Sequence, residues 1–378
     1  MTEWSELPLT EIARISRGTE PGSASYTDSS HGTRFLRVGD ITGKTDKPIY
    51  TDSRQIVLIS ESDVVLTLDG SPGYVGTGYS GAISSGIRKV EVINPDEVSL
   101  SWLRYCLQSQ PVQETIRRHT QGVTILHASS SLPHIRIPIP PLYDQERIVQ
   151  ILDDADSLKR LQTQAMFRLS LAIPSTFNKM FGYPHKNINI VKLGDIAKLE
   201  RGRFSPRPRN DPSYFDGDYP FIQTGDISDS GGLLSNYKQT LNERGKKVSK
   251  EFPAGTIVIA IVGATIGATA ILQIPVYCTD SIVGITVNPK YCYVEFVEFF
   301  LRSIRPSLLA QAPDAARANL NLEILKNISI PLSSLEQQSL FVEYCNNIRK
   351  LQALQTTNHN RIEVLFQSLL YRAFRGDL

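Results

Sequence analysis

Two stretches of about forty residues carry apolar side chains at every third or fourth position. They run from Asp144 to Phe181 and from Leu335 to Phe374. This spacing predicts two amphipathic helices, each about 60 Å long at about 1.5 Å per residue. We expect the two helices to face each other as an antiparallel, coiled-coil-like pair, with a kink or restart at Pro174. The alternative is that each helix packs on its own neighbouring domain. The predicted interface consists of Ile148, Leu152, Leu158, Leu161 and Leu169 in the first helix and Leu340, Ile348, Leu351, Ile362 and Leu365 in the second.

Shorter apolar runs between glycines and prolines predict buried strands elsewhere in the chain. One uncharged stretch, residues 252–279, is long enough to suggest a membrane helix. It is rich in β-branched residues and is interrupted by Gly255, Gly263, Gly267 and Pro275. These breaks predict two buried strands joined by a turn, and no contact with a membrane.

The order of the motifs repeats once along the chain. Each match lies 184 to 194 residues after its first copy, in the same order. A drift this small indicates an internal duplication. The matched pairs are Leu9–Gly18 with Leu193–Gly202, Phe35–Ile41 with Phe221–Ile227, Ile137–Pro140 with Ile328–Pro331, and Asp144-Gln145 with Glu336-Gln337.

The duplication predicts an α+β protein with two mixed α/β domains in a pseudo-two-fold repeat. Each domain is followed by one long helix, and a Gly-Tyr-Pro-His-Lys linker follows the first helix. We expect the domains to be separated by the helix pair, with approximate two-fold symmetry. The predicted segments are 1–141 (first domain), 142–182 (central helix), 183–332 (second domain) and 333–378 (terminal helix).

Composition and charge are those of an ordinary globular protein. The chain has 378 residues, 41% of them hydrophobic, and a formal net charge of +2. Nucleic-acid binding therefore depends on local basic clusters. The four cysteines show no Cys-x-x-Cys spacing, and the first residues contain no apolar segment typical of a signal peptide. These features predict reduced thiols and a cytoplasmic location.

A search for catalytic motifs finds only near matches. Asp211-Pro-Ser-Tyr214 differs by one residue from the Asp-Pro-Pro-Tyr pattern of adenine methyltransferases, and no glycine-rich cofactor loop precedes it. Gly39–Thr45 has three intervening residues where a phosphate-binding loop needs four. No histidine or carboxylate cluster has the spacing of metal ligands. The sequence therefore predicts a recognition protein without catalytic or metal-binding residues.

Candidate DNA-contacting residues lie in loops that recur in both halves but differ in sequence. Arginine, lysine, glutamine, asparagine, threonine and histidine can donate hydrogen bonds to phosphates or base edges. The alternative is an ordinary solvated surface. The predicted DNA-binding residues are Arg17, Arg37, Lys44, Arg117, Arg118, His119, Gln121 and Thr124 in the first half, and Arg201, Arg203, Arg207, Arg209, Gln223, Lys246, Lys247, Arg317, Asn319 and Asn321 in the second.

Taken together, these motifs resemble the specificity subunits of Type I restriction-modification enzymes. Both halves open with Leu-x-x-Ile-Ala and then Arg-Gly, and both contain Gly-Asp-Ile and an Ile-Pro exit strand before a long helix. The chain finishes with Phe374-Arg-Gly-Asp-Leu378. The resemblance covers essentially the whole chain, and it rests on the combination of motifs.

The resemblance implies a non-catalytic subunit that reads a bipartite, gapped target in double-stranded DNA. Each domain would read one half, and the helix pair would set the gap. Two modification subunits that methylate adenine with S-adenosylmethionine would dock on this chain, and restriction subunits that use ATP and Mg²⁺ would join through them. The alternatives are a duplicated protein-binding scaffold with no DNA role, and an enzyme that fuses recognition to methylation, for which the cofactor motifs are missing.

Overall fold

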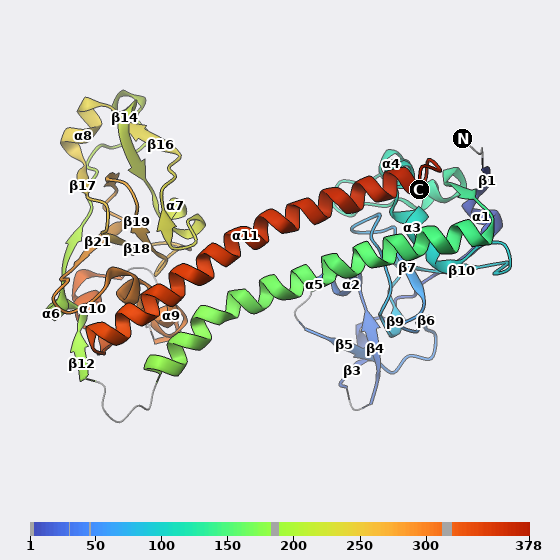
Figure 1. The fold of residues 1–378 in the computed structure, drawn as a ribbon, viewed down its shortest axis with the longest axis horizontal. Coiled ribbons are helices and arrows are strands. Elements are labelled where there is room, and N and C mark those ends of the chain that lie inside the picture. The colour runs from blue at the N-terminus through green and yellow to red at the C-terminus, as the bar shows by residue number, and fades with distance from the viewer. Residues whose placement is uncertain (1–3, 30, 45–46, 183–188, 312–319) are drawn as a thin grey trace. The chain divides into compact units, whose positions relative to one another are not determined.

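The computed structural model describes residues 4–29, 31–44, 47–182, 189–311 and 320–378. The chain divides into two compact units (Figure 1). Unit 1 combines Met1–Gln164 with Thr356–Leu378, and unit 2 is Ala165–Gln355. Each long helix therefore contributes one part to each unit. No helix among the described residues is long and apolar enough to cross a membrane.

Unit 1 contains three sheets, with the strand orders β1-β11, β2-β10-β7-β8 and β3-β5-β4-β9-β6. Their strands are β1 Ser5–Pro8, β2 Ala13–Arg17, β3 Tyr26–Thr27, β4 Thr33–Leu36, β5 Ile49–Thr51, β6 Leu58–Ile59, β7 Val64–Thr67, β8 Val75–Gly76, β9 Gly81–Ile83, β10 Ile87–Val92 and β11 Arg136–Ile139. The helices are α1 Leu9–Ile12, α2 Val38–Ile41, α3 Leu100–Gln108 and α4 Gln110–Arg118, with the short 3-10 turns η1 Ser23–Ser25 and η2 Ser129–His134. The long helix α5, Leu142–Phe181, begins in this unit.

Unit 2 repeats this plan, with the strand orders β12-β22, β13-β21-β18-β19-β15 and β16-β14-β20-β17. Its strands are β12 Asn189–Lys192, β13 Ala197–Arg201, β14 Phe215–Ile222, β15 Leu233–Leu234, β16 Gln239–Leu241, β17 Lys250–Phe252, β18 Ile257–Ala260, β19 Thr269–Leu272, β20 Val276–Cys278, β21 Ile282–Val287 and β22 Ser329–Leu332. Its helices are α6 Leu193–Ile196, α7 Thr224–Asp229, α8 Glu243–Val248, α9 Val294–Gln311 and α10 Leu322–Lys326, with η3 Pro212–Tyr214. The long helix α11, Leu335–Ala373, begins in unit 2 and ends in unit 1.

The strand registers confirm the duplication and correct one of the predicted matches. Arg17 faces Arg88 across β2 and β10, and Arg201 faces Val283 across β13 and β21. The entry and exit strands also pair alike, with Leu7 opposite Ile137 in unit 1 and Val191 opposite Ile330 in unit 2. Ile137 therefore corresponds to Ile330, so the predicted match of Ile137–Pro140 with Ile328–Pro331 is wrong by two residues. The two mixed domains and the two long helices agree with the predicted fold class.

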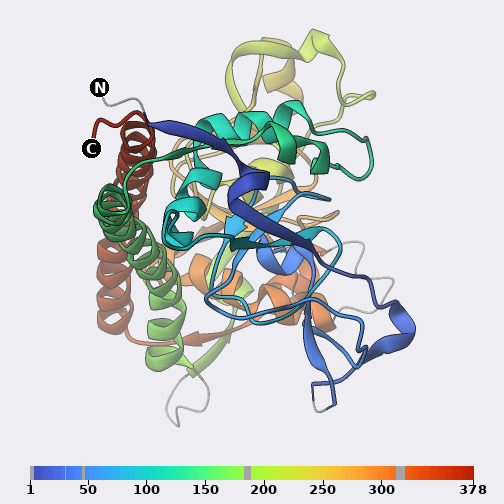
Figure 2. The same ribbon diagram turned by 90° about the vertical axis from the view of Figure 1, so that its right-hand side faces the viewer.

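Within each unit, the parts of α5 and α11 lie antiparallel and close the core of the globular domain. In unit 1, Ile148 and Leu152 of α5 share a buried cluster with Phe366 and Leu370 of α11. In unit 2, Phe177 of α5 shares one with Phe341 and Ile348 of α11. Figure 2, which turns unit 1 toward the viewer, shows the start of β1 near the C-terminal end of α11. Trp4 packs near Gly376 in this region.

The predicted helix-pair interface is only partly correct. Ile148, Leu152 and Ile348 are buried, and Leu169 packs against the unit 2 core. Ile362 is half-buried. Five residues contradict the prediction, because 46 to 61% of each remains exposed: Leu158, Leu161, Leu340, Leu351 and Leu365. The buried face of each helix is the one that packs on a globular domain, and this face differs between the two ends of the helix. A single apolar stripe along forty residues therefore does not predict which side chains are buried.

Other local predictions have mixed outcomes. The uncharged stretch forms the antiparallel strands β18 and β19, as predicted, and also the buried strand β20, which was not predicted. Pro174 lies inside α5 without interrupting it, so the helix does not restart there, and the alternative of a kink stays a prediction. The Gly-Asp-Ile motifs form the short helices α2 and α7. Asp40 and Asp226 each accept a hydrogen bond at 2.8 Å from the backbone N–H three residues earlier, which stabilises the helix start.

Candidate nucleic-acid interface

The Arg-Gly pair at the start of each domain has the same structural role in both units. The Nε of Arg17 donates to the backbone oxygen of Ser85, and the Nε of Arg201 donates to that of Asp280. A Cβ atom on Gly18 would lie 2.2 Å from a backbone oxygen of Ser84, and one on Gly202 would meet Thr279 equally closely. Only glycine therefore fits at either position. Ser85 and Asp280 consequently occupy equivalent turns, before β10 and β21.

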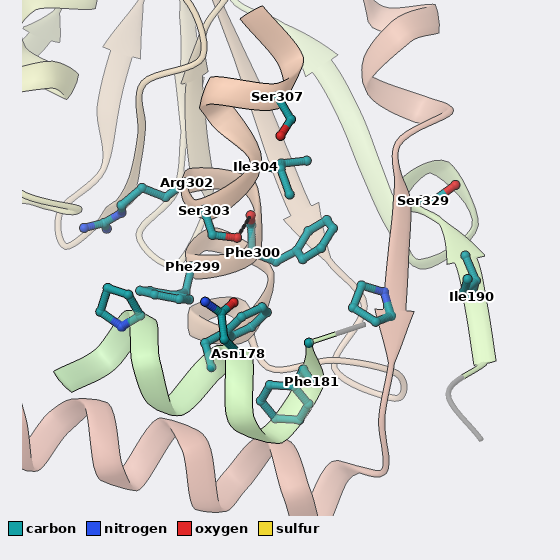
Figure 3. Close-up of a pocket in the computed structure, with 14 residues that line it drawn as sticks. Asn178, Phe181, Ile190, Phe299, Phe300, Arg302, Ser303, Ile304, Ser307 and Ser329 are labelled. Atoms are coloured by element: carbon teal, nitrogen blue, oxygen red, sulfur yellow. Dashed lines mark hydrogen bonds between the residues drawn. The ribbon is translucent and has the colours of Figure 1, made fainter. Parts of the chain in front are cut away.

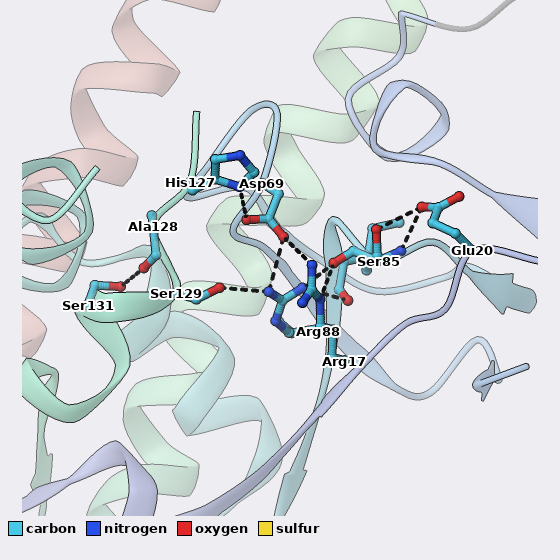
Figure 4. A network of polar contacts seen from close by, with 10 residues as sticks. Arg17, Glu20, Asp69, Ser85, Arg88, His127, Ala128, Ser129 and Ser131 are labelled. Atoms are coloured by element: carbon cyan, nitrogen blue, oxygen red, sulfur yellow. Dashed lines mark hydrogen bonds and ion pairs between the residues drawn. The ribbon is translucent and has the colours of Figure 1, made fainter. Parts of the chain in front are cut away.

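In unit 1, this turn lies beside a network of charged side chains centred on Asp69. Figure 4 shows Asp69 between His127 and two arginines. Its carboxylate lies 2.8 Å from the Nδ1 of His127, 3.1 Å from Arg88 and 3.6 Å from Arg17. Arg88 is buried and also donates to the Oγ of Ser129 at 2.7 Å. Because Arg88 pairs with Asp69 in the interior, Arg17 keeps an exposed guanidinium beside a neutralised carboxylate.

At two of the equivalent positions, unit 2 has valines instead of charged side chains. The strand registers place Val262 where unit 1 has Asp69, and Val283 where unit 1 has Arg88. Positive charge gathers instead around the turn residue Asp280. Arg209 donates to both of its carboxylate oxygens, at 2.7 and 2.9 Å, and Arg207 lies 3.6 Å away. The two units therefore present different charged groups on the same backbone frame.

The remaining predicted residues of unit 1 lie on either side of α2, at the end of α4 and in the loop that follows. Lys44, Arg117 and Arg118 are exposed. Arg37 is partly exposed, 3.9 Å from Asp40, and the ring of His119 stacks on that of His134. Gln121 and His127 exchange two backbone hydrogen bonds of 2.8 Å, and these bonds close a loop that contains Thr124. The structure thus brings Arg17 and the loop together at Asp69 and His127.

The predicted residues of unit 2 form two groups. Arg201 and Asn321 line one cavity of about 500 Å³ near Asp280, and Arg203 donates to the backbone oxygen of Ser249. Asn321 also accepts a hydrogen bond from the N–H of Ile324 and so begins α10. The second group consists of Gln223, which lies between β14 and α7, and of Lys246 and Lys247 on α8. Arg317 and Asn319 lie outside the described residues.

Aromatic and amide partners hold the second group of unit 2. The ammonium of Lys246 lies 4.1 Å from the ring centre of Tyr219, and the contact with Tyr219 raises the pKa of Lys246. The amide of Gln223 donates to that of Gln239 at 2.6 Å, while Lys247 is exposed. These side chains are fixed in place but remain accessible to a ligand.

Unit 2 also contains an apolar cavity of about 640 Å³ between α5, α9 and β22 (Figure 3). Phe177, Phe181, Phe299 and Phe300 line it. The hydroxyl of Ser303 in its wall donates to the backbone oxygen of Phe300 at 2.7 Å. Among the described residues, no group of three or more His, Cys, Asp or Glu side chains is arranged to hold a metal ion.

Comparison with known proteins identifies the family. The model of the Type I restriction modification DNA specificity domain matches residues 1–166 and again 185–364. The chain belongs to this family. It is a specificity subunit of a Type I restriction-modification system, with two target-recognition domains.

Individual relatives agree in sequence and in fold. The EcoBI specificity subunit of Escherichia coli is 24% identical, with 99% of this chain and 86% of the relative aligned. The solved S subunit from M. genitalium shares 16% identity at a TM-score of 0.59, covering 98% of this chain and 96% of that one. A chain from a study of complex assembly in the type I R-M system shares 17% identity at a TM-score of 0.64, covering 100% and 99%.

Several residues of the specificity subunit's interface were not singled out from the sequence. Asp69, Arg88 and His127 form the network of unit 1, and Asp280 organises the arginines of unit 2. The internal repeat held a usable signal for two of them. Where the first repeat has Asp69 and Arg88, the second has Val262 and Val283, so both members of an ion pair are replaced together. A paired replacement of this kind indicates contact.

Proposed function

We propose that this specificity subunit reads a bipartite, asymmetric DNA target, one half with each target-recognition domain. The observation that supports this most directly is the equivalent turn of the two units. In unit 1, Glu20 accepts hydrogen bonds from the N–H and hydroxyl of Ser85, at 3.0 and 2.9 Å. In unit 2, the turn carries Asp280 with Arg207 and Arg209. One backbone frame with different charged groups beside it favours two different half-sites.

In this proposal the long helices set the gap between the half-sites and carry the partner subunits. Each helix contributes to both units, so its length couples the two domains. Two modification subunits supply S-adenosylmethionine chemistry, and restriction subunits with ATP and Mg²⁺ join through them. This chain performs no catalysis itself, and the complex acts in the cytoplasm.

The exposed leucines of α5 and α11 support docking of partner subunits. Leu158, Leu161 and Leu365 of unit 1 are about half exposed, as are Leu340 and Leu351 of unit 2. Exposed apolar side chains on otherwise polar helices are typical of protein-binding surfaces. The globular domains do not cover these leucines, so they are available to the modification subunits.

The experiment that tests the proposal is a genome-wide map of methylated adenines in the source cell, with the gene intact and deleted. We expect a two-part motif with a fixed gap that is methylated only when the gene is present. Equal methylation in both strains, while the modification subunit is expressed, would contradict the proposal and favour the duplicated protein scaffold.

A variant separates the two half-sites. Replacing Arg207 and Arg209 with alanine should relax the sequence read by unit 2 and leave the half read by unit 1 unchanged, because these arginines belong to unit 2 alone. Arg361→Ala, which removes an exposed charge from α11, is the control and should leave the motif intact. Co-purification with the modification subunit should be normal in both variants.

A further inference from the structure

The loop after α4 presents apolar side chains to solvent at its tip. Residues 122–126 read Gly-Val-Thr-Ile-Leu. Val123 is 101% exposed, Ile125 57% and Leu126 38%. None of these three side chains belongs to the two apolar clusters of unit 1 or to the partly buried side chains packed against them. A contiguous exposed apolar group of this kind indicates a binding surface.

This loop is held rigidly, so its tip is preorganised. Gln121 and His127 close it with two backbone hydrogen bonds of 2.8 Å, and the N–H of Gly70 donates to the oxygen of Leu126 at 2.8 Å. Gly122 has φ +107°, and a Cβ there would lie 2.1 Å from the oxygen of Ile125. His127 is fixed in turn by Asp69. Binding therefore costs little ordering of the loop backbone.

The surroundings of the tip are basic, which favours DNA over a protein as the ligand. Arg117 and Arg118 are exposed in the last turn of α4, four residues or more before the apolar tip. Arg17 lies 3.6 Å from Asp69, at the base of the loop, and its side chain is 62% exposed. Asp69 itself is neutralised by Arg88. Phosphates can thus approach Arg17 at the base of the loop and the arginines at the end of α4, where Arg118 also lies 3.4 Å from Glu114.

We propose that Val123 and Ile125 form a wedge that enters a base step of the half-site bound by unit 1 and partly unstacks it. Apolar wedges flanked by cations are a known way for proteins to kink a duplex. Unstacking is easiest at pyrimidine–purine steps, so the wedge also selects sequence without hydrogen bonds to base edges. This inference rests on the proposed function, because it requires that unit 1 binds a DNA half-site.

The test uses the complete specificity subunit assembled with its modification subunits. Duplexes of the mapped target carry 2-aminopurine at one position at a time, and its fluorescence reports unstacking. We expect a several-fold increase at one step of a single half-site. Val123→Ser and Ile125→Ser should abolish that increase and weaken target binding about tenfold, while any increase at the methylated adenine persists. Val123→Leu and Ile125→Leu should retain it.

The control is Ile93→Ser, which removes an apolar side chain of unit 1 with 56% exposure, nearly that of Ile125. It should leave the fluorescence unchanged. If the wild-type complex binds the gapped duplex but the serine variants unstack it equally, the wedge is refuted and the proposed function stands. If the serine variants instead lose the modification subunits, the tip is a protein contact. If no duplex is bound specifically, both proposals fail.

Discussion

Gln145 and Gln338 occupy the same place in the two repeats, and each is fully buried with the same three hydrogen bonds to backbone. The oxygen of Gln145 accepts from the N–H of Ser99, and its amide donates to the oxygens of Glu97 and Pro140. In the same way, the oxygen of Gln338 accepts from the N–H of Tyr293, and its amide donates to the oxygens of Tyr291 and Ser333. The sequence comparison matched Gln145 with Gln337, so it was wrong by one residue.

These glutamines should be among the most sensitive polar positions of the protein. Replacing Gln145 or Gln338 with leucine leaves three buried backbone groups without partners. We expect the free energy of unfolding of the affected unit to fall by at least about 2 kcal/mol, measured by urea denaturation. Gln337→Leu is the matched control, since Gln337 is exposed, and should change it by less than about 0.5 kcal/mol. Equal effects at 337 and 338 would contradict this assignment.

A second pair of equivalent positions carries reversed charges. Arg104 of α3 donates to Asp153 of α5 at 2.7 Å and lies 4.0 Å from Asp156. At the equivalent position of α9, Glu298 is fully buried. Burial raises its pKa, which the charges of Arg302 and, on α11, Arg349 partly offset.

Arg104→Glu should therefore destabilise unit 1 by about 2 kcal/mol, because it places three carboxylates together. Adding Asp156→Arg should restore at least half of the loss, since it removes one of the three carboxylates and places an arginine where unit 2 has Arg349. Urea denaturation of the two variants checks this. Additive losses in the double variant would show that the pair is not coupled.

The contact between Lys159 of α5 and Glu363 of α11 predicts a pH dependence. The two side chains are 2.8 Å apart, and the hydrogen bond from Lys159 lowers the pKa of Glu363. A lowered pKa stabilises the folded state above the unfolded value of about 4.5, and this contribution is lost as pH falls through the folded value. Both side chains are partly exposed, so the coupling should be about 0.5 kcal/mol at pH 7.

A double-mutant cycle of Lys159→Met and Glu363→Gln measures this coupling by denaturation at pH 7 and again below pH 4. Below pH 4 the coupling should shrink towards zero. A coupling that is as large in acid as at pH 7 would mean that packing of the Lys159 ammonium on Phe366, 4.2 Å away, is the main interaction.

The exposed leucines give a prediction that separates folding from assembly. Leu158→Glu or Leu351→Glu should change the free energy of unfolding by less than about 0.5 kcal/mol, because both side chains are about half exposed. Each should reduce co-purification of the modification subunits. Leu152→Ala, at a fully buried position, should instead cost about 2 to 5 kcal/mol. Unfolding of the Leu158 variant would restore the original interpretation of that residue as part of the helix pair.

Sequence patterns predicted the repeat and the long helices well because these depend on local spacing. The Arg-Gly motif, for example, lies at the end of β2 in the first half and at the end of β13 in the second. The same patterns failed for Leu158 and Leu161, because what buries a helical face is a domain far away in sequence. Likewise, Asp69 meets His127 fifty-eight residues later, a contact that requires the folded backbone. DNA contacts of the predicted arginines stay predictions.

The division of α11 between the units has a consequence for synthesis of the chain. Unit 2 is one continuous segment, Ala165–Gln355, and can be completed soon after it leaves the ribosome. Unit 1 starts first but takes Phe366, Leu370 and Ala373 into its buried core. The domain that is translated first is therefore finished last, and until then the core face that these residues cover is open to the cell's chaperones.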